Sequence, residues 1–199
     1  MISDEVGQFS LAGAQSKIAL MQRADGGWAI PSGRVPTTHI LKPPSGDYDG
    51  FVENEIFCLR LARHFGLAAA HVEKVTAGTE SAISVERYDR VLGQDRWLRV
   101  HQEDFCQSLA ITPHLKYQSH GGPGPAEIAG VLWKHSSQPQ ADVDALMRAL
   151  VFNYLIGGTD AHAKNYSVLF GVDGNVRLAP LYDISSALPY PGLQQRKIK

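Results

Sequence analysis

Residues 143–165 read VDALMRALVFNYLIGGTDAHAKN, an apolar run that changes abruptly into a polar loop. Within the run, apolar side chains recur every three or four positions, which predicts that they lie on one face of a buried helix. The glycine pair at residues 157 and 158 is expected to end this helix. The side chains on the predicted buried face are Val143, Leu146, Met147, Leu150, Val151, Tyr154 and Leu155.

The segments on either side of this helix differ in type. Downstream, residues 166–170 and 175–178 are typical of a hairpin that turns at residues 172–175. Upstream, the first half of the chain is mostly short strands around one helix, which begins with acidic residues and stops at Gly66. The predicted strands cover residues 16–22, 28–30, 37–42, 72–75 and 81–88, and the predicted helices cover residues 53–65, 102–109 and 125–134.

Strands with one helix, followed by helices with one hairpin, predict an α+β protein of two lobes. We expect residues 1–88 to form an N-lobe, mostly an antiparallel sheet with one helix. Residues 89–199 are expected to form a mostly helical C-lobe. A cleft between two lobes is a common place for a ligand to bind.

The composition of the 199 residues is that of an ordinary globular protein, with 44% hydrophobic and 20% charged residues. The formal net charge is −1 and no long run of Lys and Arg occurs, so neither a nucleic-acid groove nor a membrane surface is indicated. The N-terminus does not have the pattern of a secretory signal, and the apolar segments are too short to span a bilayer. Two isolated cysteines, Cys58 and Cys106, favour a reducing environment and hence a cytoplasmic location.

The polar loop at residues 158–165 offers the clearest chemistry. Asp160 is followed five residues later by Asn165, the order found in the catalytic loop of protein-kinase-type phosphoryl transfer. In such a loop the Asp receives the proton of the substrate hydroxyl and the Asn binds magnesium. After the predicted hairpin, Asp183 offers a carboxylate for metal ions that bridge the phosphates. Asp and Asn are also common in loops for backbone reasons, so the spacing alone leaves a purely structural role open.

A kinase also needs a lysine on an N-lobe strand to hold the α- and β-phosphates. Lys42 ends a predicted strand, and both Glu53 and Glu55 in the next helix are candidates to pair with it. The small-residue segment 10–17, SLAGAQSK, is a candidate loop to cover a nucleotide. It is not a P-loop, because the pattern G-x-x-x-x-G-K-[ST] does not occur.

His162 supports a different hypothesis. An Asp-x-His pair followed by another carboxylate, here Asp160, His162 and Asp183, suits zinc or manganese in a metal hydrolase. The other seven histidines are scattered, and none stands at H-x-x-x-H spacing from His162. The pattern therefore favours the kinase-type site and keeps the hydrolase as an alternative.

Seven short segments, in order through nearly the whole chain, form a family pattern: SLAGAQSK (10–17), TTHILK (37–42), VERYDR (85–90), HQED (101–104), GGP (121–123), FNYLIGGTDAHAKN (152–165) and LYD (181–183). Together they resemble the HipA kinases of type II toxin–antitoxin modules. The resemblance implies a serine/threonine protein kinase that uses ATP and Mg²⁺ and has the two-lobed protein-kinase-like fold.

The resemblance also implies roles for individual residues. Asp160 matches the catalytic Asp of the family, and Asn165 and Asp183 match its metal ligands. Lys42 matches the phosphate-binding lysine, and Ser10 falls on the serine that family members autophosphorylate to silence themselves. The other implied nucleotide-binding residues are Gly13, Ala14, Gln15 and Lys17 in the phosphate-covering loop, and Glu86 and Tyr88 in the hinge that holds the adenine.

By the same resemblance, the substrate is a protein serine or threonine, for example in an aminoacyl-tRNA synthetase. The implied partner is a HipB-like helix-turn-helix antitoxin. The chain would contact DNA only indirectly, through that antitoxin. Compared with the family, the chain is short at both ends, so we expect self-association or a partner chain to cover the helix at residues 143–155. Two alternatives stay open: a catalytically impaired, truncated HipA-like binding module in a toxin–antitoxin complex, and a phosphoinositide or small-molecule kinase.

Overall fold

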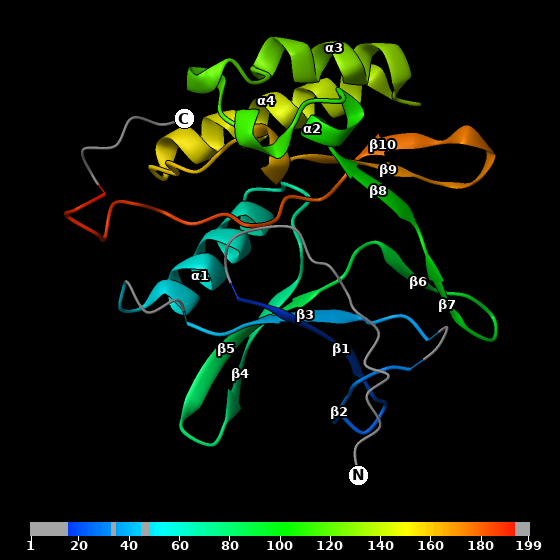
Figure 1. Cartoon of the computed structure of the whole chain (residues 1–199), viewed down its shortest axis with the longest axis vertical. Coiled ribbons are helices and arrows are strands. Elements are labelled where there is room, and N and C mark those ends of the chain that lie inside the picture. Colours follow the sequence, from blue (N-terminus) through cyan, green and yellow to red (C-terminus); the bar gives the residue numbers. More distant parts are fainter. Residues whose placement is uncertain (1–15, 33–34, 45–47, 194–199) are drawn as a thin grey trace. The chain divides into compact units, whose positions relative to one another are not determined.

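The structure is a computed structural model that describes residues 16–32, 35–44 and 48–193. The chain divides into two compact units, Met1–Ile56 with Ala70–Arg99 and Phe57–Ala69 with Val100–Lys199 (Figure 1). Helix α1 (Phe51–His64) contributes its first turns to the first unit and its remainder to the second. The lobe boundary that we expect between residues 88 and 89 stays a prediction.

The first unit is built on a five-stranded antiparallel sheet with the strand order β2-β1-β3-β5-β4. Three successive residues of β5, from Ile83 to Val85, are buried between its two neighbours. A two-residue turn joins β4 to β5, and Gly78 adopts a φ of +63° there, which glycine does without steric cost. The strands are β1 (Ile18–Gln22), β2 (Trp28–Ala29), β3 (His39–Lys42), β4 (Val72–Ala77) and β5 (Glu80–Glu86), with β6 (Arg90–Leu92) and β7 (Trp97–Arg99) as a separate hairpin.

The second unit is mostly helical and contains one three-stranded antiparallel sheet with the order β10-β9-β8. A sheet with one helix followed by helices with a small sheet confirms the predicted α+β class. The elements are β8 (His101–Asp104), α2 (Phe105–Ser108), α3 (Pro125–His135), α4 (Pro139–Leu155), β9 (Ser167–Phe170) and β10 (Val176–Leu178), with short 3-10 turns η1 (Pro113–Leu115), η2 (Gln118–His120), η3 (Ala163–Asn165) and η4 (Val172–Gly174).

The segment 102–109, predicted as one helix, is partly a strand. Its first three residues pair with β9 as part of β8, and only Phe105–Ser108 is helical. The strand ends at Asp104 because its carboxylate accepts a hydrogen bond from the Gln107 N–H at 3.0 Å, while the Gln107 side chain accepts one from the Asp104 N–H at 2.9 Å. This reciprocal capping box fixes the start of the helix.

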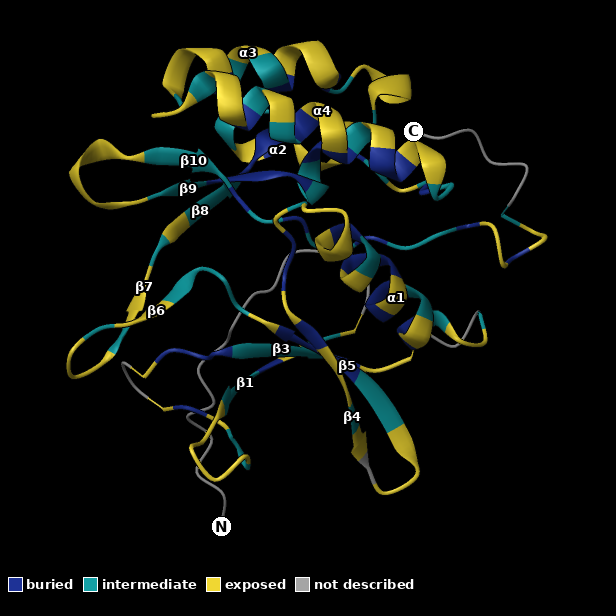
Figure 2. Ribbon diagram, turned by 180° about the vertical axis from the view of Figure 1, so that it is seen from behind, coloured by how far each residue is buried: buried dark blue, intermediate teal, exposed yellow. Residues whose placement is uncertain are grey.

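Helix α4 packs on a different face from the one predicted (Figure 2). Of the predicted set only Leu146 is buried, because α3 and β10 pack against another stripe of the helix. A helix that is apolar around most of its circumference carries two periodic stripes, and periodicity does not say which of them packs. The buried residues of α4 are Asp142, Leu146, Ala149, Phe152 and Asn153, whereas Met147, Val151, Tyr154 and Leu155 are 48–70% exposed.

A buried carboxylate joins α4 to β10. Asp142 accepts hydrogen bonds from Nη2 of Arg177 at 2.9 Å, from the Ser136 hydroxyl at 2.6 Å and from the Leu178 N–H at 2.9 Å. Burial would raise the pKa of Asp142, but these donors outweigh that effect and lower the pKa below its ordinary value. The ionised carboxylate therefore ties β10 to the first turn of the helix that leads into the polar loop.

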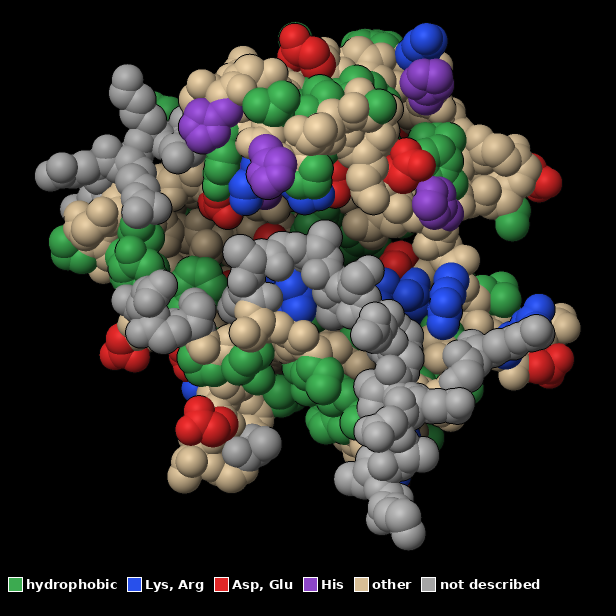
Figure 3. Space-filling view, in the orientation of Figure 1, with side chains coloured by type: hydrophobic (Ala, Val, Ile, Leu, Met, Phe, Trp, Pro, Cys, Tyr) green, Lys and Arg blue, Asp and Glu red, His purple; other side chains and the backbone are tan. Residues whose placement is uncertain are grey.

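The surface of the described residues carries mixed charge. On the face drawn in Figure 3, acidic, basic and histidine side chains are interspersed, in keeping with the formal net charge of −1. Within the described part of the chain, no helix combines the length and the apolar character needed to cross a bilayer.

We predict that Asp142→Asn lowers the free energy of unfolding by about 2 kcal/mol, because a neutral amide replaces the ionised acceptor of hydrogen bonds from three residues. Urea denaturation measures the change, and Asp144→Asn on the exposed side of the same helix should change stability by less than about 0.5 kcal/mol. The loss should shrink as the pH falls from the ordinary carboxyl pKa of 3.8 toward the lowered pKa of the folded protein, because the unfolded wild-type chain then binds a proton that the folded carboxylate does not, which reduces the stabilising effect of Asp142. A loss that stays constant down to strongly acidic pH would contradict this account.

Candidate functional site

Helix α4 ends in a glycine pair that the following loop requires. Gly157 has a φ of +63°, and a Cβ built on Gly158 would lie 2.6 Å from Oδ1 of Asn153. The Gly158 N–H donates to the Asn153 carbonyl oxygen at 2.8 Å, so the chain leaves the helix in a tight turn. The predicted glycine stop is confirmed, and it leads directly into the polar loop.

Within that loop, Asn165 holds the backbone of Asp160. Its Nδ2 donates to the Asp160 carbonyl oxygen at 2.6 Å, and its backbone N–H donates to the His162 carbonyl oxygen at 2.9 Å. Because the amide nitrogen makes the bond inside the loop, the amide oxygen of Asn165 keeps its capacity as a ligand. The spacing of Asp160 and Asn165 therefore allows the Asn165 side chain to close the loop.

Asp183 lies on a separate segment that is attached to the loop. The Leu181 N–H donates to the Ala68 carbonyl oxygen at 2.8 Å, and the Tyr182 hydroxyl donates to the Lys164 carbonyl oxygen at 2.7 Å. Burial raises the pKa of Tyr182, which keeps its hydroxyl protonated and able to donate. Asp183 itself has a φ of +53°, a left-handed conformation that Asp tolerates better than most residues and that is frequent at functional sites.

The structure brings Asp160, Asn165 and Asp183 together in the lining of one open pocket in the second unit. The buried side chains of Asn153 and Tyr166 form part of its wall. Nδ2 of Asn153 donates to the Tyr166 hydroxyl oxygen at 3.0 Å, and burial raises the pKa of Tyr166 to about 12. This part of the wall is thus neutral and held by hydrogen bonds.

The donors around the pocket suit magnesium. Two carboxylates and an amide supply hard oxygen ligands, and Mg²⁺ usually takes one or two carboxylates while water and phosphate oxygens fill its other positions. Among the described residues, no three His, Cys, Asp or Glu side chains are grouped closely enough to hold a metal by themselves, as the hydrolase alternative would require. The pocket therefore fits a metal bound together with a phosphate compound, while the roles of Asn165 and Asp183 as its ligands stay predictions.

The Asp160 carboxylate is held at one oxygen and is otherwise open to solvent. The Tyr117 hydroxyl donates to Oδ1 at 2.6 Å, and Nε2 of His162 lies 3.7 Å from the same oxygen. The ring of His162 is buried, and its Nδ1 has no hydrogen-bond partner among the described residues. Burial lowers the pKa of His162, although the Asp160 carboxylate opposes this effect. A buried imidazole, favoured in its neutral form, therefore lies beside a carboxylate that is 62% exposed.

Lys164 attaches the loop to the start of α2. Its Nζ lies 2.5 Å from Oδ2 of Asp104, whose side chain is 8% exposed. The other oxygen of Asp104 caps α2, so one carboxylate fixes both a helix start and the loop. The backbone adds a further link, since the Phe105 N–H donates to the Tyr166 carbonyl oxygen at 3.1 Å. Lys164 therefore holds the loop against the start of α2.

In the first unit, Lys42 forms a buried ion pair with Glu55. Nζ and Oε1 are 2.6 Å apart, and neither side chain is more than 5% exposed. Glu53, the other candidate, pairs with Lys74 at 2.6 Å on the surface, where both side chains are about half exposed. The structure therefore selects Glu55 as the partner of Lys42, while the role of Lys42 toward a phosphate stays a prediction.

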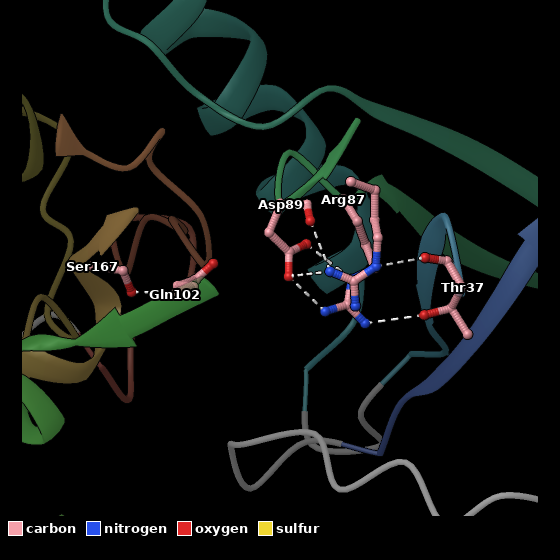
Figure 4. Close-up of polar contacts among 6 residues, drawn as sticks. Thr37, Arg87, Asp89, Gln102 and Ser167 are labelled. Atoms are coloured by element: carbon pink, nitrogen blue, oxygen red, sulfur yellow. Dashed lines mark hydrogen bonds and ion pairs between the residues drawn. The ribbon is translucent and has the colours of Figure 1, made fainter. Parts of the chain in front are cut away.

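The connector after β5 is held by a cluster of charged side chains (Figure 4). Arg87 donates to the two carboxylate oxygens of Asp89 at 3.0 and 2.8 Å and to the Thr37 hydroxyl at 3.0 Å. Arg90 donates to Oδ2 of Asp89 at 2.6 Å and to the Thr37 carbonyl oxygen at 3.1 Å. Burial would raise the pKa of Asp89, but the two guanidinium groups outweigh it and lower the pKa.

This cluster holds the backbone between and after the predicted hinge residues. Glu86 ends β5 with its N–H bonded to the His71 carbonyl oxygen at 2.9 Å, and Tyr88 is half-buried in the connector. Lys17 directly precedes β1. Their contacts with a nucleotide stay predictions. The site residues predicted in the phosphate loop that lie outside the described residues are Ser10, Gly13, Ala14 and Gln15.

Sequence reasoning assigns no role to several residues that hold the site in place. One of them, Asp104, could have been found, because the pattern D-x-x-Q that begins there is typical of a capped helix start. The contact between Tyr117 and Asp160 spans 43 residues and joins two irregular segments, so no spacing rule predicts it. The supporting residues in question are Asp104, Tyr117, Arg87, Asp89 and Asn153.

Nearly the whole chain matches a known protein family. The family described as the HipA-like C-terminal domain matches residues 9–199. A protein of Sinorhizobium fredii named "Putative kinase Y4mE" is 45% identical over 190 residues, which cover 95% of this chain and 45% of that protein. The "Serine/threonine-protein kinase toxin HipA" of Shewanella oneidensis is 32% identical over 202 residues, which cover 95% of this chain and 46% of that protein. The chain thus spans about half the length of the curated relatives it matches.

Two solved structures share the fold. A chain of the Shewanella oneidensis complex of HipA, HipB and operator DNA has a TM-score of 0.81 at 30% identity, with 100% of this chain and 48% of that chain covered. The Helicobacter pylori proinflammatory kinase CtkA has a TM-score of 0.60 at 14% identity, with 88% of this chain and 55% of that chain covered. These similarities confirm the predicted protein-kinase-like α+β fold.

We predict that Lys42→Met lowers the free energy of unfolding by about 3 to 5 kcal/mol, because Glu55 then stays buried without its cation. Lys74→Met breaks the exposed pair with Glu53 and is the matched control, with an expected loss of no more than about 1 kcal/mol. Chemical denaturation at neutral pH gives both values. Adding Glu55→Leu to Lys42→Met should recover much of the loss, and equal effects of the two lysine substitutions would argue against the buried pair.

Proposed function

Because the chain belongs to the HipA-like C-terminal domain family, we propose that it is the catalytic part of a serine/threonine protein kinase, which transfers the γ-phosphate of ATP to a protein hydroxyl with Mg²⁺. The convergence of Asp160, Asn165 and Asp183 on one pocket carries the proposal. Relatives named as kinases, at 45% and 32% identity, support it.

Asp160 is proposed to accept the proton of the substrate hydroxyl. Its carboxylate is 62% exposed, which lets a protein substrate reach it, and its backbone is held by Asn165. Phosphoryl transfer of this kind is catalysed mainly by positioning and by stabilisation of charge. A carboxylate that is accessible but fixed in place meets the first requirement.

Asn165 and Asp183 are proposed to hold Mg²⁺ against the phosphates. When bound, the metal supplies positive charge next to the phosphate oxygens. The two ligands come from different segments, which the Tyr182 hydroxyl joins through its bond to the Lys164 carbonyl oxygen. The distance between the two ligands is therefore controlled by a buried contact.

The remaining nucleotide contacts are proposed from the family resemblance. Lys42, fixed by Glu55, would bind the α- and β-phosphates. Ser10 would be the site of autophosphorylation, where a dianionic phosphate would disturb the phosphate-covering loop. The residues proposed to contact the nucleotide besides Lys42 are Glu86 and Tyr88 at the adenine and Gly13, Ala14, Gln15 and Lys17 at the phosphates.

The proposed partners follow from the same family. The solved Shewanella complex holds HipA, HipB and operator DNA, which supports a HipB-like antitoxin as the partner of this chain, with DNA reached through that antitoxin. The proposed substrate is a cytoplasmic component of translation, such as an aminoacyl-tRNA synthetase. The apolar side chains exposed on α4 support a further protein surface, from this chain or another, that covers the helix.

We predict that Asp160→Asn lowers the rate of phosphate transfer from MgATP by at least about 100-fold, because an amide cannot accept the proton. Incorporation of labelled γ-phosphate into the protein itself, mapped by mass spectrometry, measures the rate, and Asp144→Asn is the control. The variant should still be stabilised by nucleotide, by roughly 2.7 kcal/mol at 100 times its Kd. Wild-type protein that binds MgATP but transfers nothing would favour the catalytically impaired binding module instead.

Asp183→Asn tests the metal. The wild-type protein should be stabilised more by ATP with Mg²⁺ than by ATP with EDTA, and the variant should lose most of that difference because a carboxylate ligand is gone. Thermal unfolding at a fixed ATP concentration measures both. Asp173→Asn, at another Asp with positive φ but on the exposed hairpin turn, should keep the Mg²⁺ effect. If Asp183→Asn keeps it too, Asp183 is not a metal ligand.

A further inference from the structure

A tyrosine hydroxyl is bound to the carboxylate that is proposed to do the chemistry. The Tyr117 hydroxyl donates to Oδ1 of Asp160 at 2.6 Å, and Nε2 of His162 lies 3.7 Å from the same oxygen. Asn165 reaches only the backbone carbonyl of Asp160. Among the described residues, no group donates a hydrogen bond to Oδ2, so the two oxygens of this carboxylate have different surroundings.

The ring of Tyr117 is held by its neighbours. It meets the buried ring of His162 edge to face, with centroids 5.0 Å apart and planes at 72°, and the ring of His120 at 5.6 Å and 80°. Nζ of Lys116 lies over the ring, 4.9 Å from its centroid. These contacts limit the positions that the hydroxyl can take.

The backbone around Tyr117 is tied to the loop of Asp160. The Ala163 N–H donates to the Lys116 carbonyl oxygen at 3.2 Å, and the Gly122 N–H donates to the Tyr117 carbonyl oxygen at 3.0 Å. A Cβ on Gly122 would lie 1.8 Å from the Leu115 carbonyl oxygen, so only glycine allows this closure. The segment that carries Tyr117 therefore has a defined conformation and belongs to the same unit as Asp160.

We infer that Tyr117 is a positioning residue for phosphoryl transfer, whose hydroxyl holds Oδ1 of Asp160 and leaves Oδ2 for the proton of the substrate hydroxyl. The inference rests on the proposed function. In the transfer step the proton passes from the acceptor hydroxyl to Oδ2, the acceptor oxygen bonds to the γ-phosphorus, and the bond from that phosphorus to the bridging oxygen of ADP breaks, with its electron pair staying on ADP.

Two side chains then orient Asp160, each through a different part of the residue. Asn165 fixes its backbone carbonyl, and Tyr117 fixes its side-chain torsion through one oxygen. A carboxylate that is 62% exposed would otherwise turn freely about its side-chain bonds. An acceptor hydroxyl therefore meets an oxygen that is already oriented, which lowers the entropic part of the barrier.

The test compares Tyr117→Phe with the wild-type protein in phosphate transfer from MgATP to the protein itself, over a range of ATP concentrations. Removing the hydroxyl while keeping the ring should lower the maximal rate about 10- to 100-fold. The half-saturating ATP concentration should stay unchanged, since the lost contact is to Asp160. Asp144→Asn, on the exposed side of α4, is the control and should keep both values. Tyr117→Leu should be at least as slow as Tyr117→Phe.

Each other outcome overturns the inference. A normal maximal rate in Tyr117→Phe with a slow Tyr117→Leu would assign the effect to the ring as structural support. A faster Tyr117→Phe would mean that the hydroxyl occupies the place of the substrate hydroxyl and competes with it. A wild-type protein that transfers no phosphate would refute the proposed function itself, which separates the two failures. Melting temperatures of the variants show that each is folded.

Discussion

The hydrogen bond from the Asn165 side chain to the Asp160 carbonyl oxygen is the constraint on which the pocket depends. It closes the loop between the two residues, and it uses the amide nitrogen, so that the amide oxygen stays available as a ligand. The loop can start where it does only because Gly157 and Gly158 let the chain leave α4 sharply. A loop one residue longer or shorter would bring a different side chain opposite the Asp160 carbonyl, and the proposed metal ligand and the proposed proton acceptor would lose their fixed relation.

Ion pairs with a buried carboxylate hold segments in place in both units. Lys42 with Glu55, Lys164 with Asp104, and Arg177 with Asp142 each join different elements. Such a pair adds little net stability, because the loss of hydration cancels most of the attraction, but breaking it leaves a costly unpaired charge. The pairs therefore act mainly by excluding other arrangements of the same segments. A pocket built from two irregular segments needs that kind of selection, since neither has a ladder of backbone hydrogen bonds to define it.

The sequence predicts this protein best where the deciding interaction is local. The spacing of Asp160 and Asn165, the glycine stop of α4, and Gly66 with its φ of +76° after α1 all depend on contacts a few residues apart. Prediction fails where distant segments choose between similar candidates. Nothing in the helical pattern favours Glu55 over Glu53 as the partner of Lys42, and the two apolar stripes of α4 are distinguished only by what packs on them. Residues 102–109 combine a local and a distant interaction. The capping box that starts α2 is local, whereas the pairing of β8 with β9 joins segments far apart in the sequence.

The distribution of burial around Asp160 favours an acceptor of macromolecular size. His162, beside it, has only 5% of its side chain exposed, whereas the Asp160 side chain itself is 62% exposed. A site for a small molecule usually encloses its ligand and buries the reacting groups with it. A hydroxyl on the surface of another protein can reach a carboxylate only if that carboxylate stands clear of the groups that support it. The buried support and the exposed carboxylate are therefore consistent with the proposal that a protein hydroxyl meets Asp160.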